Sequence, residues 1–376
     1  MKLSERLRIL VTRIKSYFVS DQVQNFMLFL EDFFPSEKMF QSFGFTFLNR
    51  LQISITQQQS RKNIFWSSVV ISLVIWVLFI MNFLYATKSE NFILSVDTFG
   101  WISGYFMTMT KKFFLCYWKR QTIMKIIERL DRYFPHSSRE QLQFKVSEHH
   151  RNLKILHRIS LINYVWTWIH FSYMPLLSIL FGQGMQLFAP IYFPFDTMQT
   201  WLYPIIFILQ VWNLFFIFIL SISMDFLFYD LLCVISMEFD VLAQKISQID
   251  PESDENADKK FGEIIDGYNE LIDIANELED NFSPLLLVHI YGGIFMLCVS
   301  VFLLFVPMSI YFIMKNVPPI CLLLVQLFCI CFYGEQLQIS SMRVADEAYN
   351  CNWYGKNLKF RKMILLTMLR AQRPQN

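Results

Sequence analysis

The sequence predicts an all-α fold, a polytopic membrane helical bundle, and three observations lead to this prediction. First, 54% of the 376 residues are hydrophobic and only 17% are charged, whereas a soluble domain usually carries about 25% charged residues. Second, several apolar runs are long enough to cross a bilayer, which takes about 20 residues. Third, the basic residues gather almost entirely on one side of these runs. An ordinary soluble domain is therefore excluded.

The chain begins with the basic, amphipathic stretch "MKLSERLRILVTRIKSYF". Its apolar residues recur on one helical face, and it lacks the uninterrupted apolar core of a secretory signal peptide. We expect residues 1–62 to form a cytoplasmic amino-terminal region. Within it, this helix either lies on anionic lipid or packs against the rest of the cytoplasmic part.

Six membrane spans are expected, and they form a bundle over residues 63–338 with cytoplasmic helical extensions at 111–158 and 225–283. The spans run from Asn63 to Ala86, Asn91 to Thr110, Ile159 to Phe181, Trp201 to Met224, Pro284 to Met314 and Pro318 to Leu337. The fourth run continues at helical spacing as "DFLFYDLLCVISMEFDVLAQKI", so its helix should extend into the aqueous phase. The fifth run is too long for one upright span and should tilt or protrude.

The positions of the basic residues predict the orientation. Of the 33 Lys and Arg, 31 lie before the first span, in 111–158, in 245–283 or after residue 342, and only Lys88 and Lys315 lie on the other face. Because cytoplasmic loops carry the excess of Lys and Arg, the amino terminus of this multi-pass protein should be cytoplasmic.

The connection over 245–283 reverses this pattern with twelve acidic and three basic residues. "PESDEN" indicates a flexible turn, and Ile264, Tyr268, Leu271, Ala275 and Leu278 form one stripe of an amphipathic helix. The acids are either a solvated face or, if several subunits surround one exit, a means of concentrating cations there.

Motifs for catalysis, cofactor binding or metal binding are missing from the sequence. There is no Walker loop, GxSxG or HExxH motif, and Cys329 and Cys331 have no neighbouring His or Cys cluster of the kind that a metal site needs. None of the seven cysteines lies in the large outer loop. We expect no enzyme activity, cofactor, metal or nucleic-acid partner, and no disulfide framework.

Ionisable residues inside a predicted span are costly in hydrocarbon and often functional. Asp97 either binds a ligand or cation, or lies in a water-filled outer cleft near Ser95 and Thr98. His170, in "WTWIHFSYM", is either a ligand contact or a histidine whose bonds are satisfied within the bundle, and His289 is interpreted as structural.

Three segments at the carboxy-terminal end resemble the signature of insect odorant receptors: "FYGEQL" at 332–337, "VADEAYNCNWY" at 344–354 and "KFRKMILLTMLRAQRP" at 359–374. "ELEDNFSPLLLVH" at 277–289 and "PFD" in the outer loop are similar to further marks of the family. The resemblance covers the whole chain in layout and is sequence-specific mainly over 277–374.

The resemblance implies a subunit of a seven-span, inverted-topology cation channel that is opened by volatile apolar ligands and assembled with an odorant co-receptor. It also implies that residues 339–376 form a tail helix of a cytoplasmic helical anchor domain. "MILLTML" holds seven residues, about 10 Å of helix, too short to cross a bilayer. The expectation is thus a chain without the family's final, pore-lining helix.

The resemblance places the ligand among the outer halves of the second, third, fourth and sixth helices. The candidate ligand-binding residues there are Phe99, Trp101, Tyr105, Trp168, His170, Ser172, Tyr173, Trp201 and Ile205. Candidate subunit-interface residues in the tail are Tyr349, Trp353, Tyr354 and Leu358, because large aromatic residues dominate such contacts.

Other functions stay open at this point. The alternatives within the superfamily are a gustatory-type receptor subunit and a truncated, non-conducting product. A G-protein-coupled receptor needs an outside amino terminus, which the charge distribution opposes. A secondary transporter is expected to show an internal repeat or matching broken helices in its two halves, and the sequence has neither.

Overall fold

The computed structural model describes residues 62–88, 90–114, 118–135, 138–144, 146–180, 187, 189, 191, 202–251, 256–305 and 310–371. Every regular element among these residues is a helix, which confirms the all-α prediction. Three features named above lie outside the described residues. They are the expected amphipathic helix at the amino terminus, Trp201, and the large outer loop apart from residues 187, 189 and 191.

Each expected span lies within a helix, apart from the ends of some spans. The helices are α4 (Lys62–Lys88), α5 (Phe92–Phe113), α8 (Val146–Leu180), α9 (Leu202–Ser247), α10 (Ala257–Phe305) and α11 (Ile310–Asn350). Among the described residues, α9, α10 and α11 are long and apolar enough to cross a membrane by length and composition. The sequences of α5 and α8 are less apolar, and their polar side chains are buried inside the bundle, as Thr98, Thr108 and Thr167 show.

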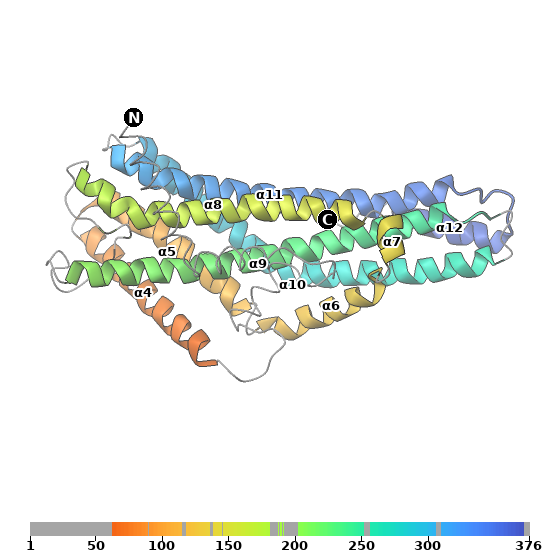
Figure 1. The fold of residues 1–376 in the computed structure, drawn as a ribbon, viewed down its shortest axis with the longest axis horizontal. Coiled ribbons are helices and arrows are strands. Elements are labelled where there is room, and N and C mark those ends of the chain that lie inside the picture. The colour runs from red at the N-terminus through yellow and green to blue at the C-terminus, as the bar shows by residue number, and fades with distance from the viewer. Residues whose placement is uncertain are drawn as a thin grey trace, which may run out of the picture.

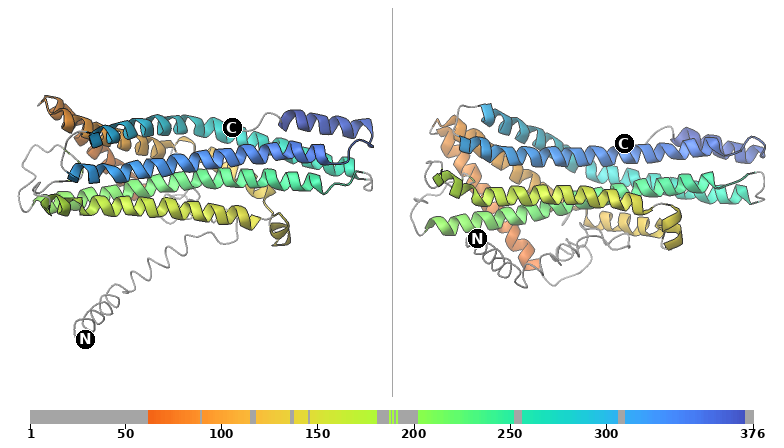
Figure 2. Two further views of the ribbon diagram at one scale, coloured as in Figure 1. Left: turned by 90° about the horizontal axis from the view of Figure 1, so that it is seen from above. Right: turned by 45° about the horizontal axis from the view of Figure 1, so that its top comes forward.

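The four long helices α8, α9, α10 and α11 run side by side along the long axis of the molecule (Figure 1 and Figure 2). Helices α4 and α5 pack at one end, which we call the α4–α5 end. Helix α12 (Leu358–Ala371) lies at the other end against α10 and α11, and α6 (Arg120–Tyr133) and α7 (Ser138–Gln143) lie along the same half.

Two helices extend past prolines at which membrane spans were expected to begin. Helix α10 continues through Pro284 and α11 continues through both Pro318 and Pro319, so the points at which these helices enter the membrane stay predictions. A proline within a membrane helix is tolerated because neighbouring helices and local adjustments satisfy the freed backbone carbonyl. Helix α10 ends at Phe305 and α11 begins at Ile310, so residues 310–314, which were expected in the fifth span, belong to α11.

The tail also differs from the single helix expected over 339–376. Helix α11 extends to Asn350, and the backbone then turns: the amide of Trp353 donates to the carbonyl of Cys351 (2.7 Å). Asn357 restarts the helix as a cap, since its side-chain oxygen accepts a hydrogen bond from the amide of Phe360 (2.8 Å). The tail is therefore the end of α11 followed by the separate helix α12.

Two apolar clusters form the core. The larger one joins α6, α8, α9, α10, α11 and α12, and its fully buried rings include Phe226, Phe239, Phe261 and Phe360. The smaller one joins α4, α5, α8 and α9 at the α4–α5 end around Phe79 and Leu214. The expected stripe on 257–283 contributes to the larger cluster, because Tyr268, Leu271, Ala275 and Leu278 are all buried.

The acids on the opposite side of α10 have a partner in α6. Arg129 lies 2.8 Å from a carboxylate oxygen of Glu270 and 2.7 Å from one of Glu277. The hydrogen bond to Glu270 and the nearby acids raise the pKa of Arg129. Part of the acidic face is thus engaged in helix packing and not only solvated.

Candidate functional site

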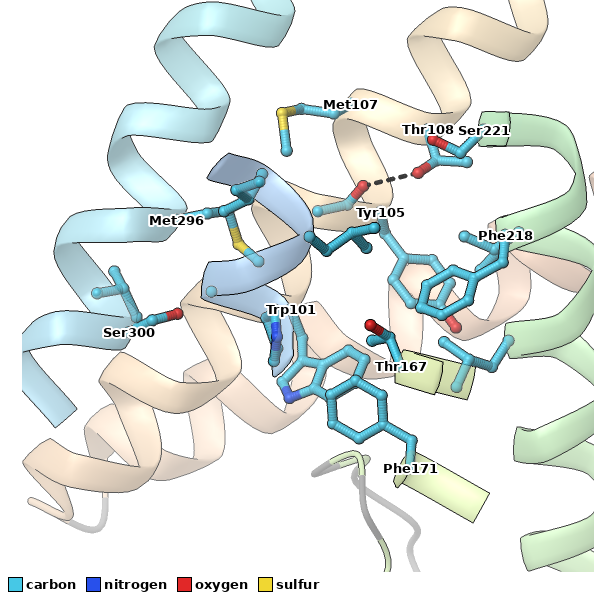
Figure 3. Close-up of a pocket in the computed structure, with 18 of the residues that line it drawn as sticks. Trp101, Tyr105, Met107, Thr108, Thr167, Phe171, Phe218, Ser221, Met296 and Ser300 are labelled. Carbon is cyan, nitrogen blue, oxygen red and sulfur yellow. Dashed lines mark hydrogen bonds between the residues drawn. The ribbon is translucent and has the colours of Figure 1, made fainter. Parts of the chain in front are cut away.

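A cavity of about 140 Å³ lies at the α4–α5 half of the bundle, enclosed by α5, α8, α9, α10 and α11 (Figure 3). Its wall is mostly apolar, with a few charged and polar groups. The principal lining residues are Asp97, Trp101, Tyr105, Met107, Thr108, Lys111, Tyr164, Thr167, Phe171, Leu214, Ile217, Phe218, Ser221, His289, Met296, Ser300, Leu303, Lys315, Leu322 and Gln326.

Helical periodicity explains how each helix presents these side chains. On α5 the lining positions Asp97, Trp101, Tyr105 and Thr108 recur every three or four residues, which places them on one face. The same spacing occurs on α8, at positions 164, 167 and 171, and on α9, at 214, 217 and 221.

Small residues bring α5 and α10 into close contact beside the cavity. A Cβ atom added to Gly292 would lie 2.4 Å from the sulfur of Met107, and one added to Gly100 would lie 3.1 Å from Val299. Met296 of α10 fills the space opposite Gly104 at 3.5 Å. Two methionines therefore fill the space between these helices, and both side chains also line the cavity.

Aromatic side chains form the wall nearest α4. The ring of Phe79 lies 6.0 Å from Trp101 and 5.0 Å from Tyr105 between centroids, and Trp101 meets Phe171 edge-on at 5.3 Å. The amide of Asn213 donates a hydrogen bond to the hydroxyl of Tyr105. These contacts fix the rings in place, so this wall is largely pre-formed.

A buried ion pair closes one end of the cavity, which we call the Asp97 end. The ammonium of Lys315 lies 2.6 Å from a carboxylate oxygen of Asp97, and the two side chains are 8% and 10% exposed. Asn82 of α4 donates to the hydroxyl of Thr98 beside this pair (2.8 Å). Both charges are thus neutralised within the protein.

A second ion pair closes the opposite end, which we call the Lys111 end. Lys111 lies 2.6 Å from Asp225, and the hydroxyl of Tyr164 donates to the other oxygen of that carboxylate (2.8 Å). The amide of Gln326 donates to the same oxygen at 2.9 Å, and Lys111 also donates to Ser221. This polar network joins α5, α8, α9 and α11.

Of the nine candidate ligand-binding residues, the structure places Trp101 and Tyr105 in the cavity wall. Phe99 is 41% exposed and lines a separate, more open hollow between α4, α5 and α10 together with Phe92, Phe295 and Phe302. Ile205 is 51% exposed on α9. Whether any of these residues contacts a ligand stays a prediction.

The four candidates on α8 lie beside the cavity and do not line it. Trp168 packs against Phe215 (5.6 Å between centroids), and Ser172 donates to the carbonyl of Trp168 (2.8 Å). A nitrogen of His170 lies 2.8 Å from the hydroxyl of Tyr173. This contact engages one of the two ring nitrogens of His170, Nδ1, so the role of His170 stays a prediction.

The candidate interface residues cluster at the turn between α11 and α12. Tyr349, Tyr354 and Leu358 are 57%, 61% and 63% exposed, and Trp353 stacks on Tyr354 at 4.3 Å. On α12, Leu366 and Leu369 are also largely exposed. Large apolar side chains thus remain uncovered on this surface of the single chain.

Sequence reasoning missed the contribution of α10 and both lysines. Lys111 had been counted with a cytoplasmic connection and Lys315 with an outer loop, but each is the buried partner of an acid. A signal existed for Lys315, because Asp97 needs a counter-charge inside the bundle. Nothing in the local sequence marks Met296 or Ser300 as cavity residues.

Comparisons with known proteins agree with this architecture. The family model described as "7tm Odorant receptor" matches residues 91–376. Odorant receptor 85c of Drosophila melanogaster is 23% identical over 321 residues, 82% of each chain, and odorant receptor 22c of the same species is 30% identical over 114 residues. The solved structure of the insect olfactory receptor OR5 from Machilis hrabei has a TM-score of 0.70 at 13% identity and covers 85% of this chain and 84% of its own. Its complex with eugenol matches equally well, at 15% identity.

Proposed function

The chain belongs to the 7tm odorant receptor family, and from this premise we propose that its cavity binds a small, apolar volatile molecule. The protein is an odorant receptor subunit and a multi-pass membrane protein. Its family is a receptor family and not an enzyme family. The observation that supports the binding site is the mostly apolar cavity between α5, α8, α9, α10 and α11.

The cavity volume defines the size of the ligand. At about 140 Å³, it is comparable to the engineered apolar cavity of about 150 Å³ that binds benzene. A molecule with one ring, or a short chain of similar volume, fits such a space. The match to a eugenol-bound relative is in keeping with a ligand of this kind.

The apolar wall also defines the expected affinity. Burying a ring-sized surface of about 150–250 Å² at about 25 cal/mol per Å² gives about 4–6 kcal/mol, before losses of ligand freedom are counted. This corresponds to dissociation constants from about the millimolar range to some tens of micromolar. Such a site distinguishes shapes only weakly, because one methylene changes binding by about 1–3 kcal/mol.

We place the subunit in a heteromeric cation channel with an odorant co-receptor at the plasma membrane, with the amino terminus and the α12 end in the cytoplasm. Two features support this arrangement: the concentration of basic residues on one side of the spans, and the exposed apolar side chains around α12, among them Tyr354 and Leu366. Exposed apolar patches on a single chain are typical of protein interfaces.

A cavity-filling substitution tests the proposal. Leu214 lines the cavity and is 2% exposed, whereas Leu209 on the same helix is 59% exposed. In cells that also express a co-receptor, Leu214→Trp should abolish volatile-evoked current because the indole occupies the ligand's space. Leu209→Trp, the matched control, should leave the current unchanged, with both variants at equal surface levels. Equal currents from both variants would contradict the proposed site.

A further inference from the structure

The hydroxyl of Ser300 faces the cavity without a hydrogen-bond partner among the residues that the structure describes. Ser300 lies on α10, is 4% exposed, and points toward the cavity interior in Figure 3. A serine or threonine inside a helix commonly donates to a backbone carbonyl three or four residues earlier. Thr108 and Thr167, in the same wall, do so at 3.0 Å and 2.8 Å.

This unsatisfied hydroxyl distinguishes Ser300 from those two threonines. Their protons are committed to carbonyl oxygens within their own helices, whereas the proton of Ser300 is available to an acceptor inside the cavity. A ligand with an oxygen atom at this position can accept this proton, whereas a hydrocarbon of the same shape would cover the hydroxyl without giving it a partner, which is unfavourable.

The position of Ser300 places this polar contact toward the Asp97 end. Its neighbour Val299 touches α5 at Gly100, where an added Cβ atom would come within 3.1 Å, and Gly100 lies one helical turn from Asp97. Trp101 and Phe171 lie at this level of the cavity (Figure 3). A bound molecule can therefore stack its apolar part on these rings while its oxygen reaches Ser300.

The charges at the two ends indicate that the ligand is neutral. Asp97 pairs with Lys315 and Lys111 pairs with Asp225, each at 2.6 Å. An ionised ligand would add a charge without a counter-charge to a site where desolvation is costly. A neutral oxygen needs only the hydrogen bond.

We propose that this subunit prefers neutral, oxygen-bearing volatiles of about one aromatic ring in size, and that Ser300 determines this preference by donating a hydrogen bond to the ligand's oxygen. The inference rests on the proposed function, because it assumes that the cavity binds volatiles. It assigns a ligand contact to α10, a helix that contributed none of the residues expected from the sequence.

Matched ligand pairs test this inference. The full chain, purified into lipid nanodiscs, is titrated with anisole and ethylbenzene and with benzaldehyde and styrene, so that each oxygenated probe has a hydrocarbon of similar shape. Ligand-dependent shifts in the thermal unfolding midpoint give the dissociation constants. One net hydrogen bond should make the oxygenated probes bind about three- to tenfold more tightly.

Two variants separate Ser300 from other hydroxyls in the wall. In Ser300→Ala, the two probes of each pair should bind with about equal dissociation constants. Thr108→Val removes a hydroxyl that is already bonded to the carbonyl of Gly104, so this variant should keep the preference for the oxygenated probe. Benzylamine and benzoate should bind more weakly than every neutral probe.

Each outcome has one meaning. Equal binding within the pairs by the unmodified chain, an unchanged preference in Ser300→Ala, or tighter binding of a charged probe would overturn the inference while leaving a volatile-binding cavity in place. Failure of every probe to bind would overturn the proposed function, and the inference with it.

Discussion

Neutralising Lys315 should destabilise the receptor strongly, and neutralising Asp97 at the same time should restore most of the loss. The two groups lie 2.6 Å apart, at most 10% exposed, and on helices separated by 218 positions in the chain. Lys315→Met therefore leaves a carboxylate in the bundle without its counter-charge. The double substitution Asp97→Asn with Lys315→Met removes both charges.

The magnitude follows from the geometry. At 2.6 Å and an effective dielectric constant of about 20, the attraction is about 6 kcal/mol. The cost of desolvating each ion is several kcal/mol, so the pair as a whole contributes little net stability. Removing one partner alone should cost about 3–5 kcal/mol, and removing both should cost far less than the sum of the two single changes.

The assay is a double-mutant cycle on thermal unfolding in detergent, followed by size-exclusion chromatography of the folded fraction. Both single variants should unfold at clearly lower temperatures than the double variant, and the exchanged pair, Asp97→Lys with Lys315→Asp, should recover part of the stability. Strictly additive losses would refute the assignment of these residues as a buried pair.

Three further predictions concern other contacts. Gly292→Ala should force Met107 out of its present rotamer and change the ranking of agonists, because the new Cβ atom would lie 2.4 Å from its sulfur, whereas Gly293→Ala, whose nearest contact is 3.8 Å away, should not change it. Arg129→Met should lower the free energy of unfolding by only about 1 kcal/mol, since its ion pairs are partly exposed, and a cycle with Glu270→Gln measures the coupling. Burial raises the pKa of Glu238 to about 8 although Lys245 acts in the opposite direction. The folded state thus holds this proton more tightly than the unfolded state, so stability should fall as the pH rises from 4.5 to about 8, and Glu238→Gln should flatten this dependence in pH-scanned unfolding.

Much of the fold follows from the sequence because apolar runs must be helical in a bilayer. The same runs placed the spans and predicted that α9 continues beyond the apolar region, as it does to Ser247. The end of the fifth span differs from the expectation, since residues 310–314 were assigned to that span and belong to α11. The backbone of α10 passes Pro284 without a break.

The candidate site was only partly predictable, for a reason of helix geometry. Successive residues are rotated by about 100° around a helix, so Trp101 and Tyr105 follow Asp97 into the cavity while Phe99 points about 200° away, to the outer hollow. The candidates were selected mainly as aromatic residues, but the sequence did not show which face of each helix points into the bundle. The candidate set therefore contained residues that line the cavity together with residues that point away from it.

The contacts between distant segments of the chain could not be predicted from a single sequence. Lys111 and Asp225 are 114 positions apart, and nothing local shows that α5 and α9 meet there. Likewise, the unpaired hydroxyl of Ser300 becomes visible only when its neighbours on the other helices are known.

The central claim is that the cavity lined by Trp101, Tyr105 and Ser300 holds the volatile ligand. Cryo-electron microscopy of the assembled receptor with 4-bromoanisole tests it most directly, because the bromine gives density that an acyl chain does not. We expect density for the ring against the wall that Trp101 and Phe171 form together, with its oxygen within hydrogen-bond distance of Ser300. Density confined to the outer hollow beside Phe99, with the cavity between α5 and α10 empty, would contradict the account.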